Sequence, residues 1–573
     1  IFQHSLADFK ALSAHEIENL GRLNTPLFKA KGSDYFTPMS WQQAIDYIVD
    51  KLSSTLADRS FFYSSGRSSN EAAFVLQLMA RMYGSGNINN CSYYCHQATG
   101  VGLTSTIGGG TATVELADLA LCDLIFVIGA NPASNHPRFI HQLKKCRDRD
   151  GHVVVINPAK EPGLVKFAVP KQASSLLKGG DWIASEYIQP NISTDLLLLK
   201  GIAKALLEQA QHDGDYIEQY TQGFEEYLAD IKASPWQDIV RISGVEREEI
   251  FNIAGYYARS ENTVFAWGMG VTHHRHGVEN VEAIANLALL RGMIGKVGAG
   301  LLPLRGHSNV QGIGSMGVKP VLADEVLLKL EQHFNIKLAK NTGMDTLACL
   351  QAAARGGIDF ALLMGGNLYA GSPDSRWAEK ALDKIACKVF LTTTLNLGHI
   401  YGNDSGESLI LPVTARDEEP QPTTQESMFN YVRLSDGGIE RLTNVRSEVA
   451  ILADIASGIL PDQGVDFSTF KQHKTLRQAI SVIVPGMEGL ADIDVAKQEF
   501  HVKNRLKHKP EFATKSNKAQ FIVHRLPWLT TKATLSLDNH FILMTVRSEG
   551  QFNSIIYEQK DSYRNIPQRW SVM

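Results

Sequence analysis

Six short runs of β-branched and aromatic residues recur along the chain, and most of them end in Gly or Asn. They cover residues 61–66, 124–131, 153–158, 264–270, 360–367 and 389–394. Continuous apolar runs of this length are typical of strands that are buried on both faces, as in parallel sheets. Ligands of such sheets bind beyond the carboxyl ends of the strands, which is where the Gly and Asn residues fall.

Amphipathic helical patterns separate these runs. Residues 41–57 place apolar side chains on one face and follow a Ser40-x-x-Gln43 capping box. Residues 70–83 follow a second such box, Ser68-x-x-Glu71. The repeated order of strand, Gly or Asn turn and helix predicts a doubly wound α/β fold.

The pattern changes after about residue 415. Residues 416–430 are polar and contain proline, which indicates an irregular connection. Residues 500–520 carry many basic side chains with little periodicity, which is typical of a solvated face or a linker. Residues 541–546 then predict the start of a new strand.

The composition is that of an ordinary globular protein, with 44% hydrophobic and 20% charged residues. The 56 basic and 60 acidic residues give a formal net charge of −4, which argues against a protein that binds a nucleic-acid backbone. The longest candidate for a membrane span, residues 116–128, is interrupted by Asp118 and Asp123. Six cysteines in 573 residues form no disulfide framework, so we expect a reducing, cytoplasmic location.

Several common cofactor motifs are missing from the sequence. The Gly-x-Gly pairs at residues 100–102 and 268–270 lack the third glycine, which disfavours an ordinary NAD-binding Rossmann unit. Gly295-Lys296 is followed by Val, so there is no phosphate-binding P-loop. No Cys-x-x-Cys pair occurs, and the sequence therefore offers no obvious zinc or iron–sulfur site.

The most informative segment is residues 89–103, in which Cys95 falls at the predicted start of a helix and is followed by His96. Backbone N–H groups and the helix dipole favour a thiolate there, and a thiolate is a soft ligand for a transition metal. The imidazole beside it is a candidate base. Taken alone, the pair favours a buried structural cysteine beside a capping histidine, and the remaining motifs change that interpretation.

Four motifs occur in a characteristic order. They are Cys95-His96 with the glycines that follow, residues 129–137, residues 267–272 and residues 304–312. Together they closely resemble molybdopterin oxidoreductases of the dimethyl sulfoxide reductase family, over essentially the whole chain. The formate dehydrogenase alpha subunits and formate-dehydrogenase-like proteins are the most similar branch, and residues 545–554 resemble the latter in particular.

The resemblance implies molybdenum or tungsten held by bis-molybdopterin guanine dinucleotide and by the side chain of Cys95. It implies His96 and Arg305 as the other catalytic residues. Asp195 would recognise guanine, because a carboxylate can accept hydrogen bonds from the guanine N1–H and amino group; Ser193 stands where the family often has Gly. The cofactor-binding residues implied in this way are Gly66, Arg67, Asn131, Asn157, Asp195, Gly268, Met269, Gly270, Gly306, Asn309, Gly365, Gly366, Asn367, Asn396, Arg547, Ser548, Gln551 and Asn553.

The strand order and the resemblance together predict parallel sheets around a central cofactor cleft. The expected divisions are an N-terminal remnant at 1–40, an α/β domain at 41–90 plus 305–415, an inserted Rossmann-like α/β domain at 91–304, a connecting region at 416–535 and the start of a molybdopterin-dinucleotide-binding β-barrel at 536–573. The family's iron–sulfur cysteines would lie upstream of Ile1, so we expect a 4Fe–4S cluster only there and none within these residues.

The sequence therefore predicts the catalytic subunit of a molybdenum oxidoreductase, with formate oxidation to carbon dioxide as the leading activity. Its partners would be a small formate-like anion and an electron-transfer protein, without nucleic acid or a membrane span. Two alternatives stay open: a related enzyme that acts on another small substrate, and a metal-free structural or electron-relay subunit. A scaffold has no need for a metal ligand, a base and an anion-binding arginine together, which argues against the second alternative.

Overall fold

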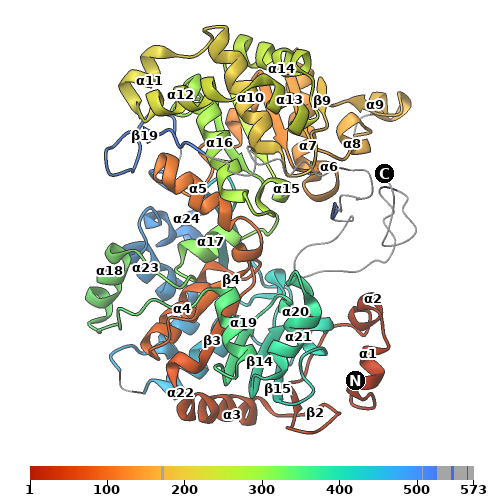
Figure 1. Ribbon diagram of the computed structural model, residues 1–573. Coiled ribbons are helices and arrows are strands. Elements are labelled where there is room, and N and C mark those ends of the chain that lie inside the picture. Colours follow the sequence, from red (N-terminus) through yellow and green to blue (C-terminus); the bar gives the residue numbers. More distant parts are fainter. Residues whose placement is uncertain (170–172, 462, 506, 525–543, 547–563, 565–573) are drawn as a thin grey trace.

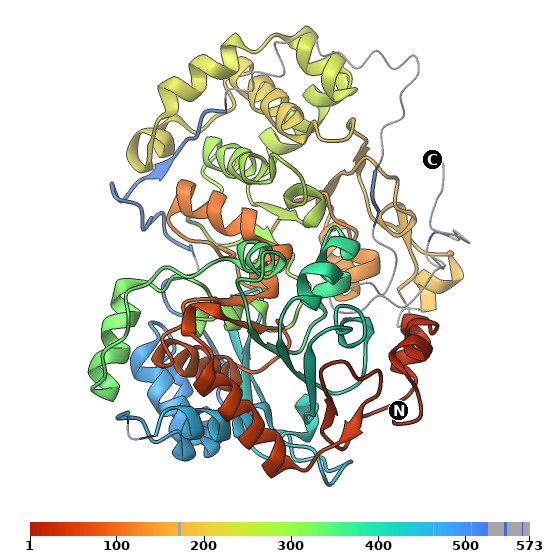
Figure 2. The ribbon, with the colours of Figure 1, turned by 60° about the horizontal axis from the view of Figure 1, so that its bottom comes forward.

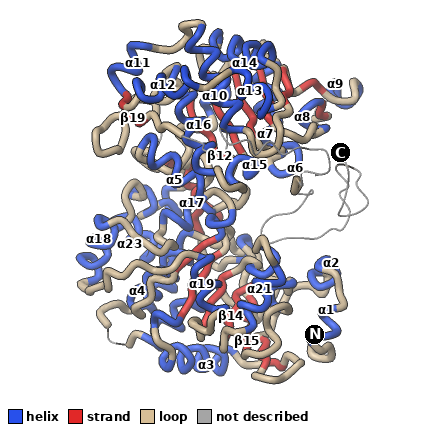
Figure 3. The backbone as a smooth tube through the Cα atoms, viewed as in Figure 1, coloured by secondary structure: helices blue, strands red, loops and turns tan. Residues whose placement is uncertain are grey.

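The computed structural model describes residues 1–573 except 170–172, 462, 506, 525–543, 547–563 and 565–573. Figure 1 shows two α/β lobes, one above the other, with residues 1–90 and about 320–500 in the lower lobe. In both lobes the strands lie inside a layer of helices, as the colouring of Figure 3 shows.

The first lobe is built on a seven-stranded sheet with the order β2-β1-β15-β14-β13-β3-β4. The strands from β15 to β4 are parallel, whereas β1 pairs antiparallel with β15 and with β2. Their bounds are β1 Leu27–Lys29, β2 Thr37–Pro38, β3 Ser60–Ser64, β4 Ile88–Asn90, β13 Phe360–Met364, β14 Cys387–Thr392 and β15 Glu407–Pro412. Residues 1–40 therefore do more than form a remnant, because they supply the two antiparallel edge strands.

The second lobe contains a five-stranded sheet with the order β12-β11-β5-β6-β9, and every pair in it is parallel. The strands are β5 Leu124–Ile128, β6 His152–Ile156, β9 Glu186–Ile188, β11 Thr263–Trp267 and β12 Gly300–Pro303. Side chains of β5, β6, β11 and β12 are almost all buried, in agreement with strands covered on both faces. The two sheets confirm the mixed α/β class with parallel sheets.

Helices α3 (Trp41–Ser54) and α4 (Asn70–Met82) cover one face of the first sheet. The expected capping box of α3 is present, since the Ser40 side chain and Gln43 bond each other's backbone N–H groups. The expected box at the start of α4 is wrong: Ser69, not Ser68, is the N-cap residue. Glu71 instead accepts hydrogen bonds from the backbone N–H and the hydroxyl of Thr424, both at 2.9 Å.

The region after residue 415 is more regular than its sequence suggested. Strands β16 (Thr423–Glu426), β17 (Tyr431–Ser435) and β18 (Phe500–His501) form an antiparallel sheet. Helix α22 (Glu448–Ile459) packs against α3 and α4, and helix α23 (His473–Ile483) packs against α4, which completes the core of this lobe. Figure 2 shows α22 and α23, in blue, in the same lobe as α3. The expectation of an irregular connection at 416–430 failed because buried tertiary partners such as Glu71 pair with this polar segment.

The basic segment 500–520 crosses to the second lobe instead of remaining a solvated linker. Strand β19 (Ala519–Gln520) pairs in parallel with β10 (Thr221–Gln222), and Phe512 and Phe521 are buried in the core of the second lobe. Most of the expected barrel segment at 536–573 lies outside the described residues. Within the part of the chain that is described, no helix has the length and hydrophobicity needed to cross a bilayer.

Candidate active site

A cleft of about 720 Å³ opens at the carboxyl ends of β3, β13 and β14. We call it the first-sheet cleft. The predicted cofactor-binding residues that line it are Arg67, Gly306, Gly365, Gly366, Asn367 and Asn396. Gly365 and Gly366 turn the chain after β13 with φ angles of +68° and +83°, which glycine adopts readily. A Cβ atom at Gly366 would lie 3.1 Å from the Tyr63 ring, so packing against this ring also favours glycine at this position.

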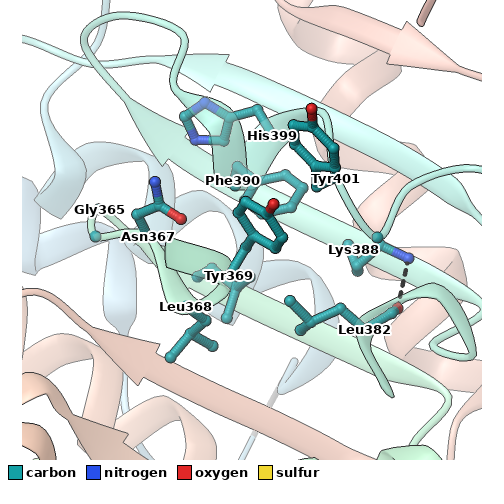
Figure 4. Close-up of a pocket in the computed structure, with 13 residues that line it drawn as sticks. Gly365, Asn367, Leu368, Tyr369, Leu382, Lys388, Phe390, His399 and Tyr401 are labelled. Carbon is teal, nitrogen blue, oxygen red and sulfur yellow. Dashed lines mark hydrogen bonds between the residues drawn. The ribbon is translucent and has the colours of Figure 1, made fainter. Parts of the chain in front are cut away.

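His399 contacts Asn396 from behind this cleft, and Figure 4 shows the small pocket beside the cleft that contains Asn367 and His399. The Nδ1 atom of His399 accepts from the backbone N–H of Asn396 at 2.9 Å. Tyr369 and Tyr401 stack with their ring centroids 4.6 Å apart next to it. Burial lowers the pKa of His399 to about 3, so its ring stays neutral and keeps this acceptor. The cleft wall is therefore held rigidly before any ligand binds.

A second group of predicted residues gathers at the carboxyl ends of the second sheet. Asn131 follows β5, Asn157 follows β6 and residues 268–270 follow β11. The Asn157 side chain donates to the Ala130 carbonyl at 3.4 Å. Asn131 is only 8% exposed, and neither polar atom of its side chain has a hydrogen-bond partner among the described residues. Such a buried amide costs free energy unless a ligand satisfies it.

Asp195 begins helix α10 (Asp195–Glu208) in the same region. Its Oδ2 lies 3.9 Å from Nε2 of His274, and burial raises the pKa of its carboxyl to about 6. A carboxylate at this position could accept from a guanine edge. Ser193, two residues earlier, has a φ of +66°, in the left-handed region that normally favours Gly. The departure from Gly noted in the sequence therefore falls on a strained backbone position.

Cys95, His96 and Arg305 come together between the two lobes. Cys95 lies between the 3₁₀ helix η2 (Cys91–Tyr94) and helix α5 (Gln97–Ile107), and it is 5% exposed. Arg305 follows β12, and the ring of His96 bonds the carbonyl of its neighbour Leu304 at 3.0 Å. Burial lowers the pKa of Arg305, and the charge of the Cys95 thiolate opposes this shift. The three side chains therefore share one buried environment.

Arg305 has spare hydrogen-bonding capacity in this environment. Its Nη2 donates to the Gly110 carbonyl at 2.9 Å, while its Nε is buried without a partner among the described residues. His136 donates through Nε2 to the Arg305 carbonyl at 2.9 Å and so holds the backbone in place. A buried guanidinium with an unused donor is suited to an anion.

His96 lies where the sequence placed it, but its ring is not arranged as a base. Trp267 donates to the Thr99 hydroxyl at 3.0 Å, so that hydroxyl donates in turn to His96 Nδ1, also at 3.0 Å. The Nε2–H group then donates to Leu304, and the ring is a neutral tautomer with both nitrogens engaged. Burial lowers its pKa to about 3. Both ring nitrogens of His96 are thus engaged within the protein, and the catalytic role expected for His96 stays a prediction.

Asn309 is a predicted cofactor-binding residue whose side chain is also engaged within the protein. It was expected to bind cofactor, but it is fully buried and its side chain is used by the protein itself. Its Nδ2 donates to the Ser68 carbonyl at 2.8 Å, and its Oδ1 accepts from the Glu426 N–H at 2.7 Å. Asn309 thus links the loop that contains Ser68 to strand β16 beside the cleft. Arg547, Ser548, Gln551 and Asn553 lie outside the described residues.

Three contacts that sequence reasoning missed hold the Cys95 loop. The Gly66 N–H donates to the Cys91 sulfur at 3.1 Å, and Thr272 donates to the Cys95 carbonyl at 2.9 Å. His273 bonds the Tyr94 carbonyl at 2.6 Å. The spacing Cys91-x-x-x-Cys95 was visible in the sequence, but nothing in it indicated that Cys91 would serve as an acceptor. These contacts connect the loop to both lobes.

The described residues contain no cluster of three or more His, Cys, Asp or Glu side chains that could hold a metal ion. A metal beside Cys95 would thus need the remaining ligands from a cofactor. The first-sheet cleft, the open amide of Asn131 and the unused Arg305 donor all fit such a group. A cofactor with two polar, nucleotide-like arms would reach both sets of strand ends.

This arrangement is that of an α/β protein with two parallel sheets whose carboxyl ends lie near a buried cysteine. The family description "Molybdopterin oxidoreductase" matches residues 22–416, and the chain belongs to this family. Members carry a pterin cofactor with molybdenum or tungsten, and the predicted family is confirmed.

Two curated relatives and one solved structure are similar to the chain. Protein YdeP of Escherichia coli K12 is 36% identical over 96% of this chain and 75% of its own. The F420-dependent formate dehydrogenase subunit alpha of Methanocaldococcus jannaschii is 29% identical over 67% of this chain and 56% of its own. The structure of acetylene hydratase from Pelobacter acetylenicus matches 87% of this chain and 69% of that one, with a TM-score of 0.66 and 16% identity, which shows the shared fold.

Proposed function

We propose that the chain is the catalytic part of a molybdenum- or tungsten-dependent enzyme that oxidises formate to carbon dioxide with removal of two electrons and one proton. The observation that carries the proposal is the buried convergence of the Cys95 thiol with the unused Nε donor of Arg305. The relative from Methanocaldococcus jannaschii that is named a formate dehydrogenase subunit supports it.

Two pterin guanine dinucleotides would occupy the two sets of strand ends. One would lie in the first-sheet cleft against Gly365, Gly366 and Asn396. The other would lie along Asn131, Asn157 and residues 268–270, with its guanine at Asp195. Backbone N–H groups at these turns would hold the phosphates. When bound, this cofactor carries the metal and takes up the electron pair.

Three side chains would hold the metal, bind the substrate and position the site. Cys95 would supply a thiolate, a soft ligand that a transition metal prefers to a hydroxyl. Arg305 would bind and orient the carboxylate of formate with its planar, two-pronged guanidinium. His96 would keep Arg305 in position through the Leu304 carbonyl, and its neutral ring would exclude water from the thiol. Electrons would pass to a partner protein or an upstream iron–sulfur cluster in the cytoplasm.

A second candidate is oxidation of another small anion by the same residues. The observation in its favour is His96, whose nitrogens are both engaged, so that this side chain offers no acceptor for a substrate proton. YdeP, which is more similar to this chain than the formate dehydrogenase subunit is, carries no substrate in its name. Both candidates use Cys95 and Arg305 in the same way.

Steady-state kinetics on protein loaded with molybdenum or tungsten tests the proposal. The wild type should reduce an artificial dye with formate, and Arg305→Lys should raise KM for formate with a smaller effect on kcat. Arg241→Lys, at an exposed ion pair with Asp238, is the matched control and should change neither constant. Metal-loaded wild type that is inactive with formate but active with another small anion would establish the second candidate.

A further inference from the structure

Two buried polar side chains in the wall of the first-sheet cleft contain atoms without hydrogen-bond partners. Glu419 lies in the loop before β16, Thr423 is the first residue of β16, and both line the cleft. Glu419 is 8% exposed and Thr423 is 1% exposed. Neither Oε2 of Glu419 nor Oγ1 of Thr423 has a partner among the described residues. The wall of one cleft therefore holds an unpaired carboxyl oxygen and an unpaired hydroxyl.

Neighbouring contacts hold these two side chains in the wall. The other oxygen of Glu419 accepts from the Thr414 hydroxyl at 2.6 Å, which leaves Oε2 for a further donor. Thr424, the next residue of β16 after Thr423, bonds Glu71 through its hydroxyl. Because successive side chains of a strand point to opposite faces, the Thr423 hydroxyl is turned away from Glu71. Buried polar atoms of this kind cost free energy until a ligand pairs with them.

Glu448, which also lines the cleft, is not in the same situation as Glu419. Its carboxyl accepts from the Ser68 hydroxyl at 3.1 Å. Burial and the charge of Glu419 raise the pKa of Glu448, whereas the Ser68 hydrogen bond and the charge of Arg416 lower it. Glu448 thus has its own partners in the cleft, and Glu419 is the acid whose buried oxygen needs a donor from a ligand.

A donor at this oxygen would also favour the charged form of Glu419. Burial raises the pKa of Glu419, and the nearby hydroxyls of Thr414 and Ser447 oppose this shift. A ligand N–H group at Oε2 would add a hydrogen bond to the carboxylate and lower the pKa further. The ligand that suits the cleft therefore presents N–H donors to Glu419.

The edge of a guanine base has this chemistry. Its N1–H and 2-amino groups are donors that a carboxylate can accept, and its O6 atom beside them accepts from a hydroxyl. Adenine has the opposite pattern, because its N1 is an acceptor and its 6-amino group is a donor. A carboxylate next to a hydroxyl therefore discriminates between the two purines.

We propose that Glu419 and Thr423 recognise the guanine base of the dinucleotide in the first-sheet cleft, with Glu419 accepting from the N1–H and 2-amino groups and Thr423 donating to O6. The inference rests on the proposed cofactor binding, which gave a base contact to the other dinucleotide only, at Asp195. A similar combination occurs there, since Nδ1 of His274 is buried without a partner among the described residues and Nε2 of the same ring lies 3.9 Å from Asp195.

The test measures base selectivity of the full chain purified free of cofactor, by titration calorimetry. GDP is the probe, because it carries guanine and a pyrophosphate group; inosine diphosphate lacks the 2-amino group, and ADP also lacks the N1–H. Every sample carries Asp195→Asn, which removes the base contact at the second sheet. GDP should bind roughly ten- to hundredfold more tightly than ADP, as expected for one hydrogen bond to a charged group. Inosine diphosphate should lie between them.

Three variants on this background assign the selectivity. Glu419→Gln puts an amide donor beside the base and removes the charge, so GDP and ADP should bind within about threefold of each other. Thr423→Val keeps the shape and removes the hydroxyl, so GDP should bind about two- to tenfold more weakly while ADP is unaffected. Glu448→Gln is the matched control in the same cleft and should keep the full preference for GDP. Thr423→Val also provides the second measurement if Glu419→Gln does not fold.

The outcomes separate this inference from the proposed function. A preference for GDP that is lost in Glu419→Gln and kept in Glu448→Gln supports the assignment. A preference that survives in both Glu419→Gln and Thr423→Val overturns it, as does an equal loss in Glu448→Gln. Asp195→Asn protein that binds no GDP, or binds GDP and ADP alike, also overturns it. The kinetics with formate on metal-loaded protein decide the proposed function independently of these titrations.

Discussion

The hydroxyl of Thr272, at the end of helix α15 (Met269–Thr272), donates to the backbone carbonyl of Cys95 at 2.9 Å. This bond joins the loop after β11 in the second lobe to the loop that carries the predicted metal ligand. Both residues are buried, so water cannot replace the bond. The position of Cys95 thus depends on the second sheet as well as on the first.

Thr272→Val should loosen this connection. The variant keeps the shape of the side chain but removes the hydrogen bond from Thr272 to the Cys95 carbonyl, which costs roughly 1–3 kcal/mol. We expect a lower melting temperature and weaker metal retention, measured by thermal unfolding and by metal analysis. Thr104→Val is the control, because the Thr104 hydroxyl bonds the Gly100 carbonyl at an exposed position. Equal effects of the two variants would contradict the role given to Thr272.

Cys95→Ser should remove the metal and the activity. A serine hydroxyl is a hard and poorly ionised ligand, so it does not replace a thiolate. The measurement is metal per chain together with dye reduction. Cys387→Ser, which changes a buried thiol in the core of the first lobe, should retain metal even if it lowers stability. Normal turnover in Cys95→Ser would exclude Cys95 as the ligand.

Arg305→Lys should weaken substrate binding more than it slows the reaction. Lysine keeps the positive charge but loses the planar pair of donors. The loss of one charge-assisted hydrogen bond, about 1.5–3 kcal/mol, corresponds to a KM that is roughly ten- to hundredfold higher. A KM that stays unchanged for every substrate that the wild type oxidises would show that the buried guanidinium does not contact the anion.

The sequence predicted best the features that depend on residues close together in the chain. The apolar runs of β3, β5, β6, β11, β13 and β14 are strands, and the Gly and Asn residues after them lie at the carboxyl ends. The capping box at Ser40 was recognisable because both partners are three residues apart. The order of the four motifs was sufficient to identify the family.

Long-range partners account for what could not be predicted. Glu71 has the spacing of a capping residue, yet it bonds Thr424, more than 350 residues away. The hydrogen bonds of His96 to Thr99 and Leu304 could not be predicted, because only the fold brings these residues to its two ring nitrogens. Asn309 carries the residue type of a ligand contact but satisfies Ser68 and Glu426. Sequence spacing contains no information on such partners.

Acid should destabilise the chain through its buried histidines. His96 and His399 have pKa values of about 3 in the folded state because of burial, compared with about 6.5 when unfolded. Below pH 6.5 the unfolded state therefore binds more protons, and each histidine lowers the free energy of unfolding by about 1.4 kcal/mol per pH unit down to pH 3. The melting temperature should fall between pH 6 and pH 4.

His399→Gln should make this fall less steep. Glutamine at position 399 does not titrate, so one of the two contributions disappears, whereas His15→Gln on the exposed helix α2 (Ala14–Glu18) should leave the slope unchanged. The measurement is the melting temperature at half-unit steps of pH. Equal slopes in the wild type and His399→Gln would show that His399 is protonated in the folded protein.

Ser193→Gly should stabilise the chain at the position that precedes Asp195. Ser193 has a φ of +66°, and a side chain in the left-handed region costs roughly 1–2 kcal/mol. Glycine removes this strain but adds about 0.4–1 kcal/mol of entropy to the unfolded chain, so the net gain should be up to about 1 kcal/mol. Ser234→Gly is the matched control, because Ser234 has an ordinary φ of −75°, and there the change should only destabilise. Thermal unfolding of both variants checks the sign. A lower melting temperature in Ser193→Gly would mean that contacts of the serine hydroxyl outweigh the backbone strain.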